Sequence, residues 1–367
     1  MTKTMDIPNE PGWRQELAEL TDFRVDRGRY ARQEVMPKVR QLSQVSNLRS
    51  IGAIGFQWAT MIVSAWAAIY SGHWLVYILA ALVIASRMQC LGVLMHDGAH
   101  YLLFTNRMVN DVVSELCLAF PLGLSTTLYR EEHLRHHRFT NTDQDPDASL
   151  PLADEDFRWP KTTRGCAWLI IRSILGLNLP RMFRATKQLS PWANLFSPLG
   201  PNLPLYSRIL LVATTLSVYT VVLSSGMLIP MLVLFVVPGF TLLNFTNRVR
   251  VTSEHMRVAA DHELNSTRTV VPNWLERFFV APFGVSYHIE HHLFPSVPGR
   301  NLGRLHDILM DDPKFTEHAH VTHSYLGVLG ELMTPAQACV APVQESAMHR
   351  RGPTILPQPQ ADTEAAV

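Results

Sequence analysis

Four long apolar blocks constrain the fold of this chain more than any other feature. Residues 51–70 carry no charged side chain, and after a four-residue link a second block runs from residue 75 to residue 95. Residues 209–225 and 227–245 form a second pair, with only residues 224–226 at its tip. About 20 apolar residues are needed to cross the hydrocarbon core of a bilayer, and links this short join antiparallel helices. The sequence therefore predicts an all-α integral membrane protein with four transmembrane helices in two hairpins.

Composition agrees with a membrane protein and excludes some functions. Charged residues make up 17% of the 367 residues, against about 25% in typical soluble domains. The net charge of +1 gives no basic footprint, so no nucleic-acid partner is expected. The four cysteines are far apart, so we expect no fused iron–sulfur or rubredoxin-like domain. No signal peptide is visible at the start, and insertion is expected to depend on the internal blocks.

The distribution of basic residues predicts the orientation in the membrane. Lys and Arg are absent from both hairpin tips and frequent near the opposite ends, at Arg49, Arg107, Arg208, Arg248 and Arg250. By the positive-inside rule, both termini lie on the cytoplasmic side, together with the block ends that are opposite the hairpin tips. Arg87 interrupts the second block, and a charge at the bilayer centre costs at least about 2.5 kcal/mol. We therefore expect Arg87 near the cytoplasmic interface, with the helix continuing out of the lipid.

Three histidine-rich motifs lie at or beyond the predicted cytoplasmic ends. HDGAH places two histidines four residues apart, and HLRHH and HIEHH each place three in an HxxHH spacing. Residues three and four apart share one face of a helix, so each motif directs its imidazoles to one side. The motifs contain eight histidines: His96, His100, His133, His136, His137, His288, His291 and His292. This repeated spacing predicts a metal site.

Eight histidines exceed the three or four protein ligands that one ion usually takes, which indicates two metals. Imidazole suits iron, zinc, copper and nickel alike, so the ligand type does not choose the metal. His255 follows the fourth block on the same predicted face and is a ninth candidate. Metal-bound histidine commonly donates its second N–H to a carboxylate. Asp97 and Glu290 are the nearest in sequence to do so.

In order and spacing, the motifs HDGAH, HLRHHRFTNTDQDPD and YHIEHHLFPSVPGRNLGRLH resemble the histidine boxes of the membrane fatty acid desaturase family. The resemblance covers residues 58–309. It implies a cytoplasmic, histidine-rich cap that holds two non-haem Fe ions, with O₂ as co-substrate, and the removal of two hydrogens from an alkyl chain. It implies that the eight box histidines are ligands of the metal ions. His255 is similar to an extra histidine of family members.

Finer features of the boxes bear on the substrate and the electron donor. Three residues separate the histidines of the first box, which resembles the acyl-lipid or acyl-carrier-protein branch of the family. The third box begins with His288 rather than the Gln typical of cytochrome-b5-fused members, and no HPGG haem motif occurs. The resemblance therefore implies an external electron donor of the ferredoxin, rubredoxin or cytochrome b5 type.

Several alternatives remain open from the sequence. Carotenoid ketolases or hydroxylases and acyl hydroxylases of the same superfamily carry similar boxes. A zinc-dependent membrane hydrolase needs one metal and fewer histidines, and a metal or haem transport protein should place its histidines within the spans. The sequence does not separate the carotenoid enzymes or the acyl hydroxylases from an acyl desaturase.

The resemblance also suggests how the chain is divided. We expect a cytoplasmic N-terminal segment at residues 1–48, a membrane desaturase domain at 49–312 and a C-terminal segment at 313–367. The end of the chain, residues 341–367, is rich in Pro, Ala and Gln and is expected to be disordered. Residues 112–128 and 165–183 are apolar but interrupted, and we expect them to lie at the membrane interface.

Overall fold

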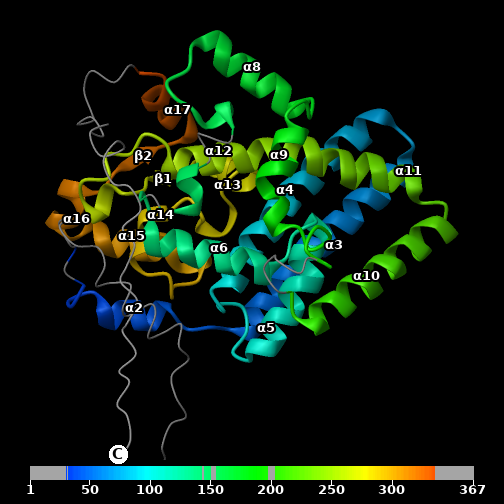
Figure 1. Ribbon diagram of the computed structural model, residues 1–367, viewed down its shortest axis with the longest axis horizontal. Coiled ribbons are helices and arrows are strands. Elements are labelled where there is room, and N and C mark those ends of the chain that lie inside the picture. The colour runs from blue at the N-terminus through cyan, green and yellow to red at the C-terminus, as the bar shows by residue number, and fades with distance from the viewer. Residues whose placement is uncertain (1–29, 31, 143, 150–153, 197–202, 335–367) are drawn as a thin grey trace, which may run out of the picture. The chain divides into compact units, whose positions relative to one another are not determined.

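The structure is a computed structural model that describes residues 30, 32–142, 144–149, 154–196 and 203–334 (Figure 1). Helices predominate in this part of the chain. Those of the first half are α2 (Met36–Leu42), α3 (Asn47–Ser71), α4 (Trp74–Ala99), α5 (Arg107–Ser114), α6 (Thr126–Phe139), α8 (Thr163–Ile174) and α9 (Leu179–Thr186). Those of the second half are α10 (Leu205–Ser224), α11 (Leu228–Met231), α12 (Asn244–His255), α13 (Trp274–Phe279), α14 (His288–Leu293), α15 (Gly299–Met310), α16 (Pro313–His318) and α17 (Tyr325–Met333). The predicted disordered tail lies outside the described residues.

Four helices are long and apolar enough to cross a membrane, which is the number that the sequence predicts. They are Asn47–Ser71, Trp74–Ala99, Leu205–Ser224 and Leu228–His255. A fifth candidate, Arg107–Leu122 with Thr126–Phe139, is bent by 91°. Two thirds of the most apolar part of α4 is buried (67%), against 11–22% for the other three spans. α4 is therefore the central helix. The pairing of the spans as two membrane hairpins and the position of the cap on the cytoplasmic side stay predictions from the sequence.

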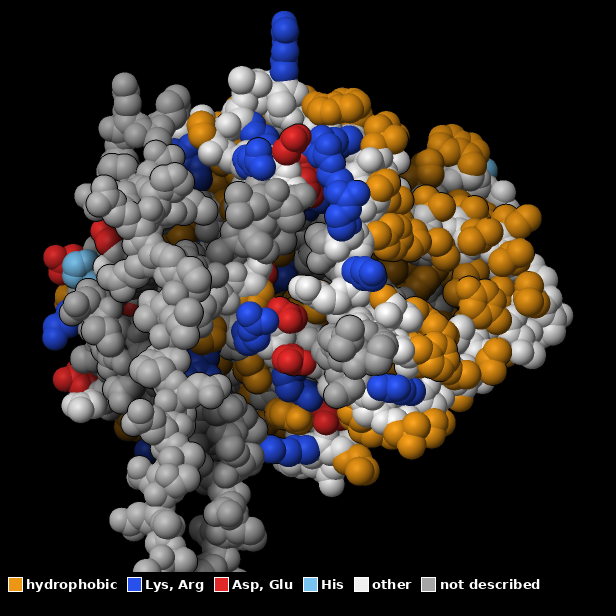
Figure 2. Space-filling view, viewed as in Figure 1, with side chains coloured by type: hydrophobic (Ala, Val, Ile, Leu, Met, Phe, Trp, Pro, Cys, Tyr) orange, Lys and Arg blue, Asp and Glu red, His pale blue; other side chains and the backbone are white. Residues whose placement is uncertain are grey.

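The exposed surface of the other spans is apolar. In Figure 2, hydrophobic side chains gather over the region of α3, α10 and α11, while Lys, Arg, Asp and Glu gather elsewhere on this face. Exposed examples include Phe56 and Trp66 of α3 and Leu216 of α10. Large exposed apolar surfaces of this kind mark a lipid or protein contact.

The fourth span is not a regular α-helix. Between α11 and α12 it contains two π-helical segments, η6 (Leu232–Val236) and η7 (Gly239–Leu243). A third π segment, η1 (Glu115–Ala119), and the 3₁₀ turn η2 (Phe120–Leu122) follow α5. π segments inside helices are frequently found at functional sites. Here they precede α12, which carries His255, and α6, which carries the histidines of the second motif.

The last third of the chain packs around α14. Strand β1 (Thr269–Val271) pairs in parallel with β2 (Val321–His323), with Val270 opposite Thr322. An apolar cluster joins α14, α15 and α16 to the segment before α3, where Tyr30 and Val39 are buried. The Tyr30 hydroxyl donates to Asp312 at 2.8 Å. Residues on both sides of the predicted domain limits at 48 and 312 therefore share one core, and the limits themselves stay predictions.

Candidate metal centre

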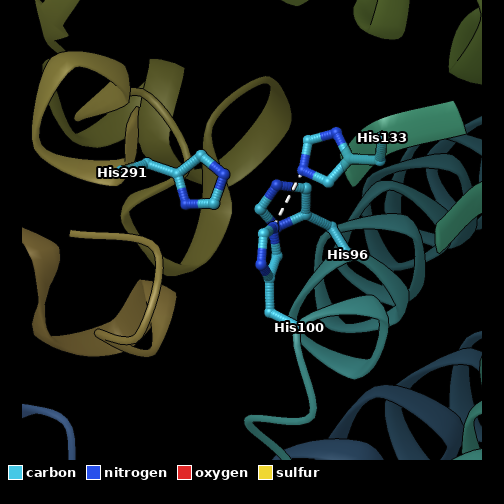
Figure 3. Close-up of side chains that lie close together, drawn as sticks. All are labelled: His96, His100, His133 and His291. Atoms are coloured by element: carbon cyan, nitrogen blue, oxygen red, sulfur yellow. Dashed lines mark hydrogen bonds between the residues drawn. The ribbon is translucent and has the colours of Figure 1, made fainter. Parts of the chain in front are cut away.

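Three helices bring one set of four histidines together (Figure 3). α4 provides His96 and its C-terminal cap residue His100, α6 provides His133, and α14 provides His291. All four are buried, and their ligand nitrogens lie within 4.8 Å of one another. The Nε2 atoms of His100 and His133 are 2.9 Å apart. We call this set the first histidine group.

A second set of four lies beside the first. α6 provides His136, α12 ends at His255, and α14 provides His288 and His292. Their ligand nitrogens also lie within 4.8 Å of one another. The Nε2 atom of His288 is 2.8 Å from that of His255 and 3.1 Å from that of His292. His255 is half-buried and the other three are buried. We call this set the second histidine group.

The ninth histidine, His137, contacts both groups. Its Nε2 atom lies 2.8 Å from that of His291 and 3.1 Å from that of His133, both in the first group. Its ring stacks on that of His292 in the second group, with centroids 4.3 Å apart. The structure thus brings all nine predicted histidines into one centre, and their role as ligands is taken up as a proposal below.

The spacing of the ring nitrogens fits bound metal. Nitrogens of two imidazoles at right angles around an ion, each about 2.1 Å from it, are about 3.0 Å apart. The observed Nε2 pairs of 2.8–3.1 Å match this value. In addition, Nε2 of His96 and Nε2 of His136 are buried without a hydrogen-bond partner among the described residues. Buried polar atoms normally have a partner, so unpartnered nitrogens in both groups support two ions.

Burial keeps most of these imidazoles in the form that binds metal. It lowers the pKa of His133 and His291 well below the usual value, and neighbouring histidines lower it further. Burial, with the charge of Arg130, lowers the pKa of His100 to about 3. Neutral imidazole is the metal ligand, so the centre is prepared for a cation at neutral pH.

The second group has a carboxylate partner. His136 donates its Nδ1 hydrogen to Asp145 at 2.8 Å, and Asp147 lies 3.6 Å from the same nitrogen. Although burial alone would lower it, the bond to Asp145 and the nearby carboxylate charges raise the pKa of His136. A carboxylate in this position fixes the ring orientation and makes the other nitrogen a better donor to a metal. In the first group, the corresponding contact is from the Tyr129 hydroxyl to Nδ1 of His133 at 3.3 Å.

The two carboxylates selected from sequence have other partners in the structure. Asp97 accepts the backbone N–H of Gly299 at 3.2 Å and lies 3.8 Å from Nδ1 of His96, beyond hydrogen-bond reach. Glu290 accepts from His306 at 2.6 Å and from Thr269 at 2.5 Å. Asp97 thus connects α4 to α15, and Glu290 connects α14 to α15 and β1. Their predicted contact with metal-bound histidines stays a prediction.

Local structure explains how α6 reaches the centre. The Ser125 side chain caps its first turn by accepting from Leu128 N–H. The buried carboxylate of Glu115 accepts from Ser125, and from the backbone and side chain of the residues that open α6. A carboxylate at a helix N-terminus stabilises the helix dipole. Glu115 and Asp145 were not selected from the sequence, because each lies 9 to 12 residues from its partners, beyond the three- and four-residue spacing of a helical face.

Two groups of four histidines, with His137 between them and four apolar helices beside them, define a helical protein with candidate membrane spans and a centre able to hold metal. The family model for fatty acid desaturases matches residues 72–325, which is more than half of the chain. The chain therefore belongs to the fatty acid desaturase family and is an oxidoreductase of the desaturase type. The family uses iron, and it implies a lipid substrate and a membrane setting.

Individual relatives are distant. The chain is 27% identical to the dihydrorhizobitoxine desaturase of Bradyrhizobium elkanii, over 76% of this chain and 81% of that protein. It is 27% identical to a Δ5 fatty acid desaturase of Caenorhabditis elegans, over 64% of this chain and 57% of the relative. It is 26% identical to the acyl-lipid (9-3)-desaturase of Physcomitrium patens, over 78% of this chain and 56% of the relative. The chain thus spans somewhat more than half the length of the last two.

Proposed function

We propose that this chain is a membrane-bound diiron fatty acyl desaturase that introduces a double bond into an acyl chain. The observation that carries the proposal is the pair of four-histidine groups, with His137 in contact with both. The overall reaction consumes O₂, two electrons and two protons, converts one CH₂–CH₂ unit to CH=CH, and releases two water molecules. Two Fe ions held there would supply the O₂ activation that an unactivated alkyl chain requires.

The residues around the ions have defined tasks in this proposal. The nine histidines hold the metals, and Asp145 keeps a proton on Nδ1 of His136, so that Nε2 faces the ion. Burial of the centre excludes bulk water from the reacting carbon. Because a small misplacement of that carbon costs orders of magnitude in rate, the rigid attachment of α4, α6 and α14 to one another is part of the catalytic apparatus.

The setting of the reaction is also proposed. The four apolar helices would form two membrane hairpins, with both termini and the histidine centre on the cytoplasmic side. The absence of Lys and Arg from both tips supports this orientation. Electrons would come from a separate ferredoxin, rubredoxin or cytochrome b5.

The acyl group would be carried by a lipid or by an acyl carrier. The acyl-lipid desaturase among the relatives supports the first. Hydroxylation of the same chain is the main competing outcome, because one relative is a human sphingolipid Δ4-desaturase/C4-monooxygenase, 35% identical over 81 residues. Family membership favours redox chemistry over the zinc-hydrolase alternative.

The test is analysis of total fatty acids by gas chromatography with mass spectrometry, in a host that expresses the full chain. Controls are His136→Ala and, as a matched histidine outside the centre, the exposed His323→Ala. We expect a new double bond with the intact protein and with His323→Ala, and none with His136→Ala. The purified protein should contain about two irons per chain.

Two outcomes would contradict the proposal. An unchanged fatty-acid profile, with two irons bound, would redirect the search to carotenoids or hydroxylated lipids. Zinc in place of iron in active protein would overturn the oxygen chemistry.

A further inference from the structure

Arg87 is a buried cation in the middle of the most buried candidate span. Its side chain is 7% exposed, and no carboxylate in the described part of the chain lies within ion-pair distance of it. Its hydrogen-bond partners are neutral: Gln57 Oε1 at 3.2 Å, Ser86 Oγ at 2.7 Å and the Phe278 carbonyl at 3.3 Å. The Phe278 ring lies 4.3 Å from the guanidinium carbon.

These contacts solvate the charge but do not neutralise it. A guanidinium has five N–H donors, and three of them are used. The Nε atom is buried without a partner among the described residues. Charged side chains within candidate transmembrane helices are normally paired, and buried donors are normally satisfied. The guanidinium therefore keeps a net positive charge and unused N–H donors that suit an anion.

A cleft of about 460 Å³ opens beside this guanidinium. Its wall combines α3, α4 and α13, and includes Gln57, Arg87 and a second guanidinium, Arg277. Arg277 is exposed and donates to the Pro272 carbonyl at 3.2 Å. The cleft thus presents two positive charges and no acidic side chain.

The mouth of the cleft is apolar. Phe56 of α3 is 62% exposed and Trp274 of α13 is 75% exposed, and both line the cleft. The neighbouring Leu275 and Phe278 are exposed as well. Exposed aromatic rings beside a membrane span are typical of the lipid–water interface. A ligand that fits this cleft carries a negative group on an apolar chain, which a soluble anion lacks.

We propose that this cleft binds an anionic lipid. The phosphate or carboxylate of the lipid lies between Arg87 and Arg277, where its oxygens accept hydrogen bonds from the unused guanidinium N–H groups. Its apolar chain lies along Phe56 and Trp274. The site is distinct from the histidine centre and does not depend on the metal chemistry.

The test is lipid binding by the purified full chain in detergent, followed by native mass spectrometry. The probes are dioleoylphosphatidylglycerol, oleate and, as the lipid without net charge, dioleoylphosphatidylcholine. We expect at least one of the two anionic probes to bind about tenfold more tightly than the phosphatidylcholine, as the gain of one charge-assisted contact predicts. Tight phosphatidylglycerol binding assigns the site to a phospholipid, and tight oleate binding alone assigns it to a free fatty acid.

Substitutions of the two cleft arginines test whether the anionic probe binds in the cleft. Arg87→Gln and Arg277→Gln should each weaken binding of the anionic probe about tenfold, whereas Arg40→Gln, an exposed arginine of α2, should not change it. Because Arg277 is exposed, its variant gives a result even if Arg87→Gln does not fold. The proposal is wrong if the three probes bind equally, or if tight binding survives Arg277→Gln with the chain folded.

Discussion

The two histidine groups have the same number of imidazoles but differ in what surrounds them. The second group has a carboxylate at hydrogen-bond distance, from Asp145 to His136. In the described chain the first group has only a phenol at 3.3 Å, from Tyr129 to His133. The nearest carboxylate, Asp97, lies 3.8 Å from His96 and bonds to Gly299 instead.

This difference indicates that the two proposed metal positions are not equivalent. A carboxylate partner adds negative charge near one ion and raises the basicity of its ligand. The second position should therefore bind its metal more tightly and favour the higher oxidation state, while the first keeps a less basic set of ligands.

Removal of one histidine from each group is expected to give the largest effect. His100→Ala should lose the metal of the first position and His255→Ala that of the second, so each variant should retain about one metal per chain. Activity should fall by more than about a hundredfold in both, since even outer partners of a metal site contribute 10–100-fold. Metal content is measured by inductively coupled plasma mass spectrometry. If either variant loses both ions, the groups are one cooperative site.

The outer partners should give the next effect. Asp145→Asn removes the negative charge but keeps the shape, and should weaken metal binding by about 10–100-fold. Tyr129→Phe removes a longer, neutral hydrogen bond and should weaken it only about threefold. Competition with a chelator measures how tightly each variant holds its metal. The reverse ranking would show that the carboxylate does not distinguish the two groups.

The first group also depends on a close helix approach. Gly98 lies between His96 and His100, and a Cβ there would overlap the Ser114 hydroxyl and lie 3.3 Å from a Leu103 methyl. Gly98→Ala should destabilise the protein by about 1–3 kcal/mol, the cost of overpacking. The control is Gly92→Ala on the same helix, where the nearest atom is 3.8 Å away and the change should be neutral or slightly stabilising. Thermal unfolding of the two variants in detergent measures the difference. Equal midpoints would contradict the close approach.

We expect the smallest effect from a change in the contacts that hold the end of α12, where His255 lies. The buried guanidinium of Arg268 donates to the carbonyls of Ser253 and Met256, at the end of α12, and pairs with Glu331 at 3.1 Å. Burial alone would raise the pKa of Glu331, but hydrogen bonds from His320 and Thr322 and the charge of Arg268 lower it to about 2.

A lowered carboxyl pKa stabilises the fold above its unfolded value of about 4.3, and this contribution is lost as the pH falls toward 2. Because Glu331 is 40% exposed, the contribution is about 1 kcal/mol or less. Glu331→Gln should therefore lower the unfolding midpoint slightly at pH 7, and the difference should shrink as the pH falls from 5 toward 2. A difference that stays the same between pH 5 and pH 2 would contradict the assignment.

The sequence was sufficient to predict the helical class, the number of spans and the nine histidines of the centre. Helical periodicity is a short-range property, so HxxHH and HxxxH directly indicate which side chains share a face. The apolar blocks are equally local. His255, outside any box, was found from its position after the fourth block.

The partners of these histidines could not be predicted in the same way. Asp97 was selected because it follows His96, yet it bonds to Gly299, 202 residues later. Glu290 was selected for the same reason, yet its partners are His306 and Thr269. The π segments and the parallel pairing of β1 with β2 likewise depend on tertiary packing, and nothing in the local pattern indicates them.

The assembly of the first group from α4, α6 and α14 has a consequence for protein synthesis. About 190 residues are translated between His100 and His291, which takes about 10–40 s at 5–20 residues per second. During that interval the histidines of α4 and α6 are already in the nascent chain without the ligand that completes their site. If the group holds iron as proposed, loading follows translation of α14, and a chain that ends before residue 288 carries five of the motif histidines without the residues that complete either group.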